Sequence, residues 1–157
     1  MVNSRTKKPP LLYKQLFFVY NEGNSPHIHV SHIIAEFLGF YLNVILQNVK
    51  VVSYGISDIF EQMINVKKGD LVIGIGFPRY ATKTINALDF AKSRGADVVA
   101  ITDSKRSPLA SKADYTLIAE SNMASFVDSL VAPLSVINAL IIAVGMKEKE
   151  YISETIR

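Results

Sequence analysis

Two kinds of apolar pattern alternate along the 157 residues of this chain. Short, mostly apolar runs occur at LFFVY (16–20), VKVVS (49–53), LVIGI (71–75), VVAI (98–101) and YTLIA (115–119). Runs of this length are typical of strands that are buried on both faces, as the strands of parallel sheets are. Most of the segments between them carry apolar residues at three- and four-residue intervals, which indicates helices. The pattern therefore predicts five strands that alternate with helices.

Capping residues mark where several helical segments begin. Ser25 followed by Pro26 is a helix-start signal after the first run. Ser57 or Asp58 can cap a second helix, and Ser107 can cap a single helical turn. Each signal follows a predicted strand by a few residues, as expected for strands and helices that alternate.

The longest apolar stretch of the chain runs from residue 126 to 144. It contains Asp128 and Pro133, so we interpret it as a buried or interface helix and not as a membrane span. Ser125-x-x-Asp128 fits a capping box at the head of this helix, and Gly145 fits its C-terminal stop.

The order of these elements predicts the fold class. Strands that alternate with helices form parallel sheets through right-handed crossovers. We expect a three-layer α/β fold with a doubly wound, five-stranded parallel sheet in the flavodoxin-like order 2-1-3-4-5. The switch point would then lie between the strands that end at Tyr20 and Ile75. Open sheets of this kind bind small ligands there, so the site should be formed by the loops 21–25, 76–81 and 102–107.

Charge is distributed unevenly along the chain. Four of its 17 basic residues precede the first acidic one, which leaves 13 basic against 14 acidic residues in the remainder. The high pI of about 9.1 thus reflects the start of the chain and does not suggest a nucleic-acid-binding surface. Lys7 to Pro10 favour an extended, solvated backbone. We therefore divide the chain into a linker or tail (1–12) and one domain (13–157).

Several kinds of chemistry are not indicated by the sequence. Cysteine is absent, so there is neither a disulfide nor a thiolate site, which is compatible with a cytoplasmic location. His29 and His32 are three residues apart, but no Asp or Glu accompanies them in a known metal-ligand pattern. The segment GIGFPRYA lacks the spacing of a dinucleotide fingerprint, and no Ser-His-Asp arrangement can be recognised. We expect no catalytic residue, no metal and no cofactor.

Two segments resemble a known family. They read DLVIGIGFPRYATKTINALDFAKSRGADVVAITDSKRSPLASKADYTLIA and SFVDSLVAPLSVINALI. They closely resemble the sugar isomerase (SIS) domain of RpiR-type bacterial transcription regulators (MurR/RpiR family), from about residue 69 to 148. The resemblance implies a C-terminal SIS domain that senses a phosphosugar and is joined to an N-terminal helix-turn-helix domain. No helix-turn-helix can be found in this chain, so DNA would be bound only through a domain that is not present here.

The resemblance also implies where a phosphate would be held. SIS domains use a Ser after the first strand and a Ser-x-Ser-Gly-x-Thr-like loop after the third, because hydroxyls and helix-start amides donate to phosphate oxygens. Asn24 and Ser25 fit the first element, whereas Gly76 and Ala81 replace hydroxyl positions of the second. That loop therefore either binds through the guanidinium of Arg79 or no longer binds. The candidate ligand-binding residues are Asn24, Ser25, Gly76, Arg79, Tyr80, Thr82, Thr102 and Ser104.

Simpler roles remain open for these residues. Ser25 would serve equally well as a helix cap, Arg79 as an exposed loop charge, and Thr102 and Ser104 as turn residues. Thr84 is a further possible source of a hydroxyl near Thr82.

The leading hypothesis is a phosphosugar-sensing effector domain of a transcription regulator, without enzymatic activity. It would bind a phosphorylated sugar or a similar small anion, form a homodimer through its apolar first and last helices, and have no contact with a membrane. One alternative is a phosphosugar isomerase or related enzyme, for which Glu120 lies near the place of the family's general base. Another alternative is a SIS domain that acts only as a dimerisation module, which Gly76 and Ala81 favour.

Overall fold

The strands of the protein form a single parallel sheet. The computed structural model describes residues 13–20, 30–53, 57–120, 129–149 and 153. The strands are β1 (Leu16–Val19), β2 (Val49–Val52), β3 (Leu71–Ile75), β4 (Asp97–Thr102) and β5 (Tyr115–Ile118). Neighbouring strands pair in parallel in the order β2-β1-β3-β4-β5. The predicted fold class and the strand order 2-1-3-4-5 are confirmed.

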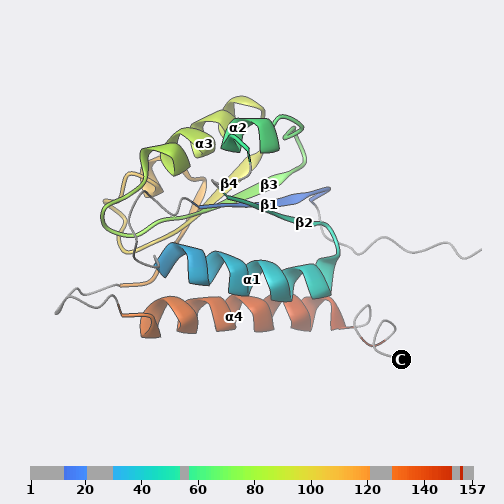
Figure 1. Ribbon diagram of the computed structural model, residues 1–157. Coiled ribbons are helices and arrows are strands. Elements are labelled where there is room, and N and C mark those ends of the chain that lie inside the picture. Colours follow the sequence, from blue (N-terminus) through green and yellow to red (C-terminus); the bar gives the residue numbers. More distant parts are fainter. Residues whose placement is uncertain (1–12, 21–29, 54–56, 121–128, 150–152, 154–157) are drawn as a thin grey trace, which may run out of the picture.

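Helices cover both faces of the sheet (Figure 1). One face carries α1 (Val30–Leu46) and α4 (Val131–Lys147), which lie side by side, and the other carries α2 (Ile59–Gln62) and α3 (Thr82–Ser93). A 3-10 turn, η1 (Ala110–Lys112), precedes β5. The three layers place the carboxyl ends of the strands along one edge of the sheet, which we call the carboxyl edge.

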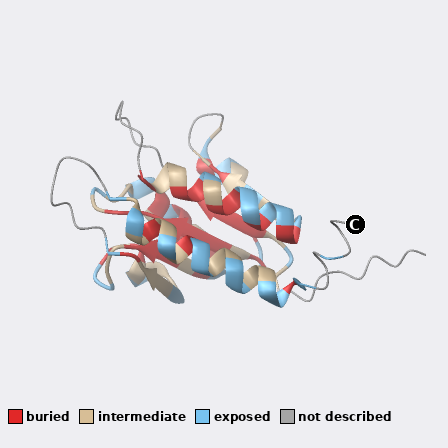
Figure 2. Ribbon diagram, turned by 90° about the horizontal axis from the view of Figure 1, so that it is seen from below, coloured by how far each residue is buried: buried red, intermediate tan, exposed pale blue. Residues whose placement is uncertain are grey.

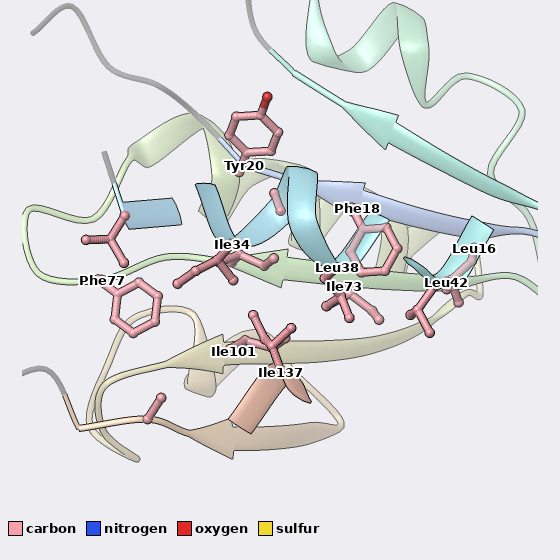
Figure 3. Packing of buried hydrophobic residues seen from close by; sticks show 14 of the residues in the cluster. Leu16, Phe18, Tyr20, Ile34, Leu38, Leu42, Ile73, Phe77, Ile101 and Ile137 are labelled. Atoms are coloured by element: carbon pink, nitrogen blue, oxygen red, sulfur yellow. The ribbon is translucent and has the colours of Figure 1, made fainter. Parts of the chain in front are cut away.

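The side chains of β1 explain why its apolar run is continuous. Phe18 and Tyr20 are buried in the cluster beneath α1 (Figure 3), whereas Phe17 and Val19 are buried in the cluster on the α3 side. Because successive side chains of a strand point to opposite faces, a strand covered on both faces needs apolar residues at every position.

Gly74 lets α3 approach the middle of β3. A Cβ atom at this position would lie 2.6 Å from Cδ2 of Leu88, which is closer than real Cβ contacts. Leu88 is fully buried on α3, so any side chain at Gly74 would push the helix away from the sheet.

Some predicted helix ends are confirmed and others are wrong. Asp58 caps α2, because its carboxylate accepts from the N–H of Phe60 at 3.1 Å. Gly145 does not end the last helix, which continues to Lys147. The helix also begins only at Val131, and the proposed capping box at 125–128 lies outside the described residues. Packing against α1 stabilises α4 past its internal glycine, which overrides the local stop signal.

Both α1 and α4 carry exposed residues (Figure 2), and several of these have large apolar side chains. Phe40 and Val44 on α1 are 65% and 56% exposed, and Ile142 and Met146 on α4 are 61% and 73% exposed. Within the described residues no helix is long and apolar enough to cross a membrane.

Candidate functional site

The loops after β3 and β4 lie together at the carboxyl edge. β3 pairs with β4 up to Ile75 and Ile101, and the N–H of Gly76 donates to the carbonyl oxygen of Ile101 at 3.1 Å. The two chains therefore leave the sheet as neighbours. Asn24 and Ser25, which were expected to complete the site, lie outside the described residues.

A hydrogen-bonded group joins these two loops. The hydroxyl of Tyr80 donates to Oδ1 of Asp103 at 2.6 Å, and the hydroxyl of Thr102 donates to the same oxygen at 3.1 Å. Burial, together with the hydrogen bond to the nearby Asp103 carboxylate, raises the pKa of Tyr80 to about 12. Thr102 is fully buried, so its hydroxyl serves to orient Asp103.

Arg79 has a backbone conformation that is unfavourable for its residue type. Its φ angle is 72°, in the left-handed region, and its side chain is exposed. This conformation costs a non-glycine residue about 1 to 3 kcal/mol and is concentrated at functional sites. The hydrogen bond of the next residue, Tyr80, to Asp103 helps to hold the loop in this shape.

Positive charge is found at the start of α3 and in the loop after β4. The N-cap residue of this helix, Ala81, provides no side-chain hydrogen bond, so the first-turn amides are not capped by it. Arg79, Lys83, Lys105 and Arg106 are all exposed and cationic. The positive end of the helix dipole adds to these charges, and together they favour an anion at this edge.

Gly76 replaces an expected hydroxyl for a reason of packing. A Cβ atom at this position would lie 2.8 Å from Cδ2 of Leu109, which is fully buried. Ser107 holds the Leu109 segment in place, since its Oγ accepts from the N–H of Ala110 at 3.1 Å, as the predicted cap requires. Because its N–H is bonded to Ile101, Gly76 has only a carbonyl oxygen to offer to a ligand.

The remaining candidate residues differ in accessibility. Thr82 is exposed in the first turn of α3, and Ser104 is half-buried in the loop after β4. Thr84 is buried, and its hydroxyl has no hydrogen-bond partner within the described part of the chain. Asp103 lies between the candidate residues Thr102 and Ser104 but was not itself chosen as one, and Leu109 was not considered as a site residue. The TDS segment after a predicted strand was the available signal for Asp103, but no sequence signal indicated that Leu109 packs on Gly76.

A second polar group, which the sequence did not predict, lies at the end of β1. The hydroxyl of Tyr20 donates to Oε1 of Glu36 at 3.0 Å and lies 2.9 Å from Nδ1 of His32. The hydroxyl of Tyr20 has one proton, which it donates to the carboxylate of Glu36. The contact with His32 therefore needs a proton on Nδ1, which donates to the oxygen of Tyr20. Tyr20 is almost fully buried, so this group fixes α1 to β1.

The described residues contain no group of three His, Cys, Asp or Glu that could hold a metal ion. His27 and His29 lie outside them. Glu120, the candidate base of the enzyme alternative, is exposed two residues after β5.

Comparison with known families gives the decisive observation. A family model described as the SIS domain matches residues 29–143, which include every described helix and strand except β1 and the last residues of α4. The chain belongs to the SIS domain family. The expected resemblance to the SIS domains of RpiR-type regulators is also confirmed. The sugar isomerase domain of an RpiR transcription factor from Sphaerobacter thermophilus superposes with a TM-score of 0.82 at 29% identity, over 93% of this chain and 78% of that one.

Relatives of this SIS domain include regulators and an enzyme. An uncharacterised HTH-type transcriptional regulator of Caldanaerobacter subterraneus is 36% identical over 89 residues, which are 54% of this chain and 32% of that protein. A phosphoheptose isomerase of Thermodesulfovibrio yellowstonii is 30% identical over 118 residues, or 66% of this chain and 58% of the enzyme. The SIS domain thus spans from about a third to just over half the length of these relatives.

A further solved structure shares the fold of the SIS domain. The Vibrio vulnificus NanR protein, complexed with ManNAc-6P, superposes with a TM-score of 0.68 at 18% identity. The superposition covers 92% of this chain and 54% of that one.

Proposed function

We propose that this SIS domain is the phosphosugar-sensing effector domain of a transcription regulator whose DNA-binding domain lies outside the chain. The observation that carries the proposal is Arg79, an exposed arginine held in a left-handed conformation beside the uncapped start of α3. Strain of this kind is retained where the surrounding structure fixes a residue for a purpose. A guanidinium at a helix N-terminus suits a phosphate group or a similar small anion.

The similar proteins support the proposal that this domain belongs to a transcription regulator. A relative named as an HTH-type regulator and an RpiR transcription factor are both similar to this chain, and NanR, which shares the fold, binds ManNAc-6P. A sensor needs to bind its sugar without converting it. A cytoplasmic location accords with this role.

Direct catalysis on a phosphosugar is the second candidate. The identity of 30% with a phosphoheptose isomerase favours it. A sugar isomerase needs a general base within hydrogen-bond reach of the proton that moves. Among the described residues of the carboxyl edge, Asp103 is half-buried and Glu120 is exposed, so neither carboxylate is desolvated as the general base of an enzyme commonly is. We therefore place the sensor first.

A homodimer completes the proposed sensor. Two helices of 17 residues lie side by side and form a face of about 25 Å by 20 Å, given 1.5 Å per residue and a helix diameter of about 10 Å. Its projected area of about 500 Å² is of the same order as the roughly 800 Å² of accessible surface that each partner contributes to a standard interface. Its exposed Phe40, Val44, Ile142 and Met146 would be covered by a second copy. A ligand that favours one geometry of the dimer would change the spacing of the attached DNA-binding domains.

A thermal-shift screen with sugar phosphates, followed by an assay for turnover of each hit, tests the proposal. Stabilisation without turnover supports the sensor, whereas turnover supports the isomerase. If no sugar phosphate stabilises the protein, the remaining alternative is a SIS domain that serves only to dimerise.

A further inference from the structure

The carboxylate of Asp103 is bonded through only one of its two oxygens. Oδ1 accepts from the hydroxyls of Tyr80 and Thr102, and no donor among the described residues reaches Oδ2. Two donors on one oxygen fix the plane and the direction of the carboxylate, so the position of Oδ2 is fixed as well. Asp103 is half-buried, and Oδ2 can accept hydrogen bonds from outside the protein.

Asp103 differs from other loop aspartates of the chain in its choice of partners. Asp58, Asp70 and Asp114 each accept from a backbone N–H, that of Phe60, Lys67 and Val98 respectively. The contacts of Asp58 and Asp70 stabilise a helix end and a local turn, and that of Asp114 joins the segment before β5 to β4. Among the described residues, Asp103 accepts only from side-chain hydroxyls, that of the adjacent Thr102 and that of Tyr80 in the other loop, and from no backbone N–H.

The location of Asp103 links it to the anion site. Its partner Tyr80 is the residue after Arg79, and its own loop carries Lys105 and Arg106. A carboxylate within a cationic edge does not assist anion binding, because it repels a phosphate. It suits the other part of a sugar phosphate, since the hydroxyls of a sugar are good donors to a charged acceptor.

We propose that Asp103 is a specificity-determining residue that accepts a hydrogen bond from a hydroxyl of the bound ligand through Oδ2. The inference rests on the proposed anion site at Arg79. It adds that the ligand carries a hydroxyl group beside its anionic group. The ligand is an anion that carries a free hydroxyl group, and Asp103 is what distinguishes it from a bare anion. Tyr80 and Thr102 are the residues that position this acceptor.

The substitution Asp103→Asn tests the inference with two probes. Its amide oxygen can still accept from Tyr80 and Thr102, while an NH₂ group replaces the acceptor oxygen and the negative charge is lost. Isothermal titration of wild type and variant would use inorganic phosphate and whichever of glucose 6-phosphate, fructose 6-phosphate and N-acetylmannosamine 6-phosphate binds the wild type most tightly. We expect the variant to bind the sugar phosphate about tenfold more weakly, because a charge-assisted hydrogen bond is replaced by a neutral one. Its affinity for inorganic phosphate should stay the same or rise slightly, since a repelling charge is removed.

Two further variants separate recognition from structural effects. Asp97→Asn removes the same charge at the opposite end of β4 and should leave both affinities unchanged. Tyr80→Phe keeps the carboxylate but removes one hydroxyl that positions it, so it should weaken sugar phosphate binding in the same direction by a smaller factor. The melting temperature of each variant reports whether it is folded, and Tyr80→Phe provides the test if Asp103→Asn is not.

The outcomes distinguish this inference from the proposed function. If Asp103→Asn binds both probes equally well or better than the wild type, Asp103 does not contact the ligand and the inference is overturned, while the anion site remains. If the wild type binds neither inorganic phosphate nor any of the three sugar phosphates, the proposed function is contradicted and the inference falls with it. Weaker binding of the sugar phosphate, but not of inorganic phosphate, in Asp103→Asn and to a smaller extent in Tyr80→Phe, with Asp97→Asn unchanged, supports both.

Discussion

The hydroxyl of Tyr80 lies 2.6 Å from Oδ1 of Asp103, and this hydrogen bond joins loops whose residues are 23 positions apart in the chain. One end of the bond is next to the strained backbone of Arg79, and the other is next to the end of β4. The bond therefore connects the residue proposed to bind the anion with the strand that supports the loop.

Replacement of Tyr80 by Phe should lower stability and change its dependence on alkaline pH. We expect a loss of about 1 to 2 kcal/mol in the free energy of unfolding at pH 7, because a half-buried hydrogen bond to a charged group is removed. The pKa of Tyr80 is raised in the folded state, from the ordinary 10 to about 12. Its contribution is therefore fully present below pH 10 and is lost as the pH rises toward 12. Urea unfolding between pH 7 and 11 measures both effects, and an equal decline of wild type and variant above pH 10 would contradict this account.

Arg79→Gly should separate stability from binding. Glycine adopts a positive φ without steric cost, so we expect the free energy of unfolding to stay unchanged or to rise by up to about 1 kcal/mol. Binding of any anion at the site should be lost, because the guanidinium is removed. Lys68→Ala is the matched control, since it removes an exposed positive charge before β3, at the end of that strand away from the site. A clear loss of stability in Arg79→Gly would show that the arginine side chain has a structural role.

Gly76→Ser restores a hydroxyl that the family resemblance leads one to expect, and it should be unfavourable here. The new Cβ would lie 2.8 Å from Leu109, so we expect a loss of about 1 to 3 kcal/mol from overpacking. Leu109→Ala alone should cost about 2 to 5 kcal/mol, because it leaves a cavity. In the double variant the serine occupies part of that cavity, so its loss should be smaller than the sum of the two by about 1 kcal/mol. Chemical denaturation of all four proteins measures this, and strict additivity would contradict the packing argument.

Asp114 should contribute to stability at neutral pH and not in strong acid. The N–H of Val98 donates to its carboxylate at 2.8 Å and, with Lys92 at 3.2 Å, holds the pKa of Asp114 below its usual range despite partial burial. A lowered pKa gives stability that is present above the unfolded value of about 3.8 and is lost as the pH falls through the folded value. Asp114→Asn should therefore lose about 1 kcal/mol at pH 7 and show a shallower decline below pH 4.

The matched control for this experiment is Asp89→Asn. Its carboxylate lies 3.0 Å from Lys112 in an exposed ion pair, which should contribute little. An acid decline that is the same in wild type and Asp114→Asn would contradict the role given to Asp114.

Much of the fold could be predicted because the signals are local. A strand covered on both faces must be continuously apolar, as Leu16–Val19 is, and the alternation of strands with helices leaves few possible topologies. The stop assigned to Gly145 was wrong because packing between α1 and α4, which brings together distant parts of the chain, overrides the propensity of one glycine.

The site could be predicted only in outline. Arg79 was chosen as a candidate because of its loop, and Thr102 because of its place at a strand end. The backbone conformation of Arg79 and the burial of Thr102 depend on contacts between distant parts of the chain. Asp103 gained its significance from Tyr80, which is 23 residues away, and Gly76 from the burial of Leu109. No pattern within a single loop encodes such pairs, so the sequence indicated the edge of the sheet and not the arrangement of donors on it.

The most direct test of the central claim is calorimetric titration of the wild-type chain and of Arg79→Gly with sugar phosphates, together with an assay for turnover. We expect at least one sugar phosphate to bind the wild type without being converted, and none to bind Arg79→Gly, although that variant remains folded. Equal affinity of the two proteins for the same sugar phosphate would contradict the claim that Arg79 forms the anion site, and turnover by the wild type would contradict the claim that the domain is a sensor.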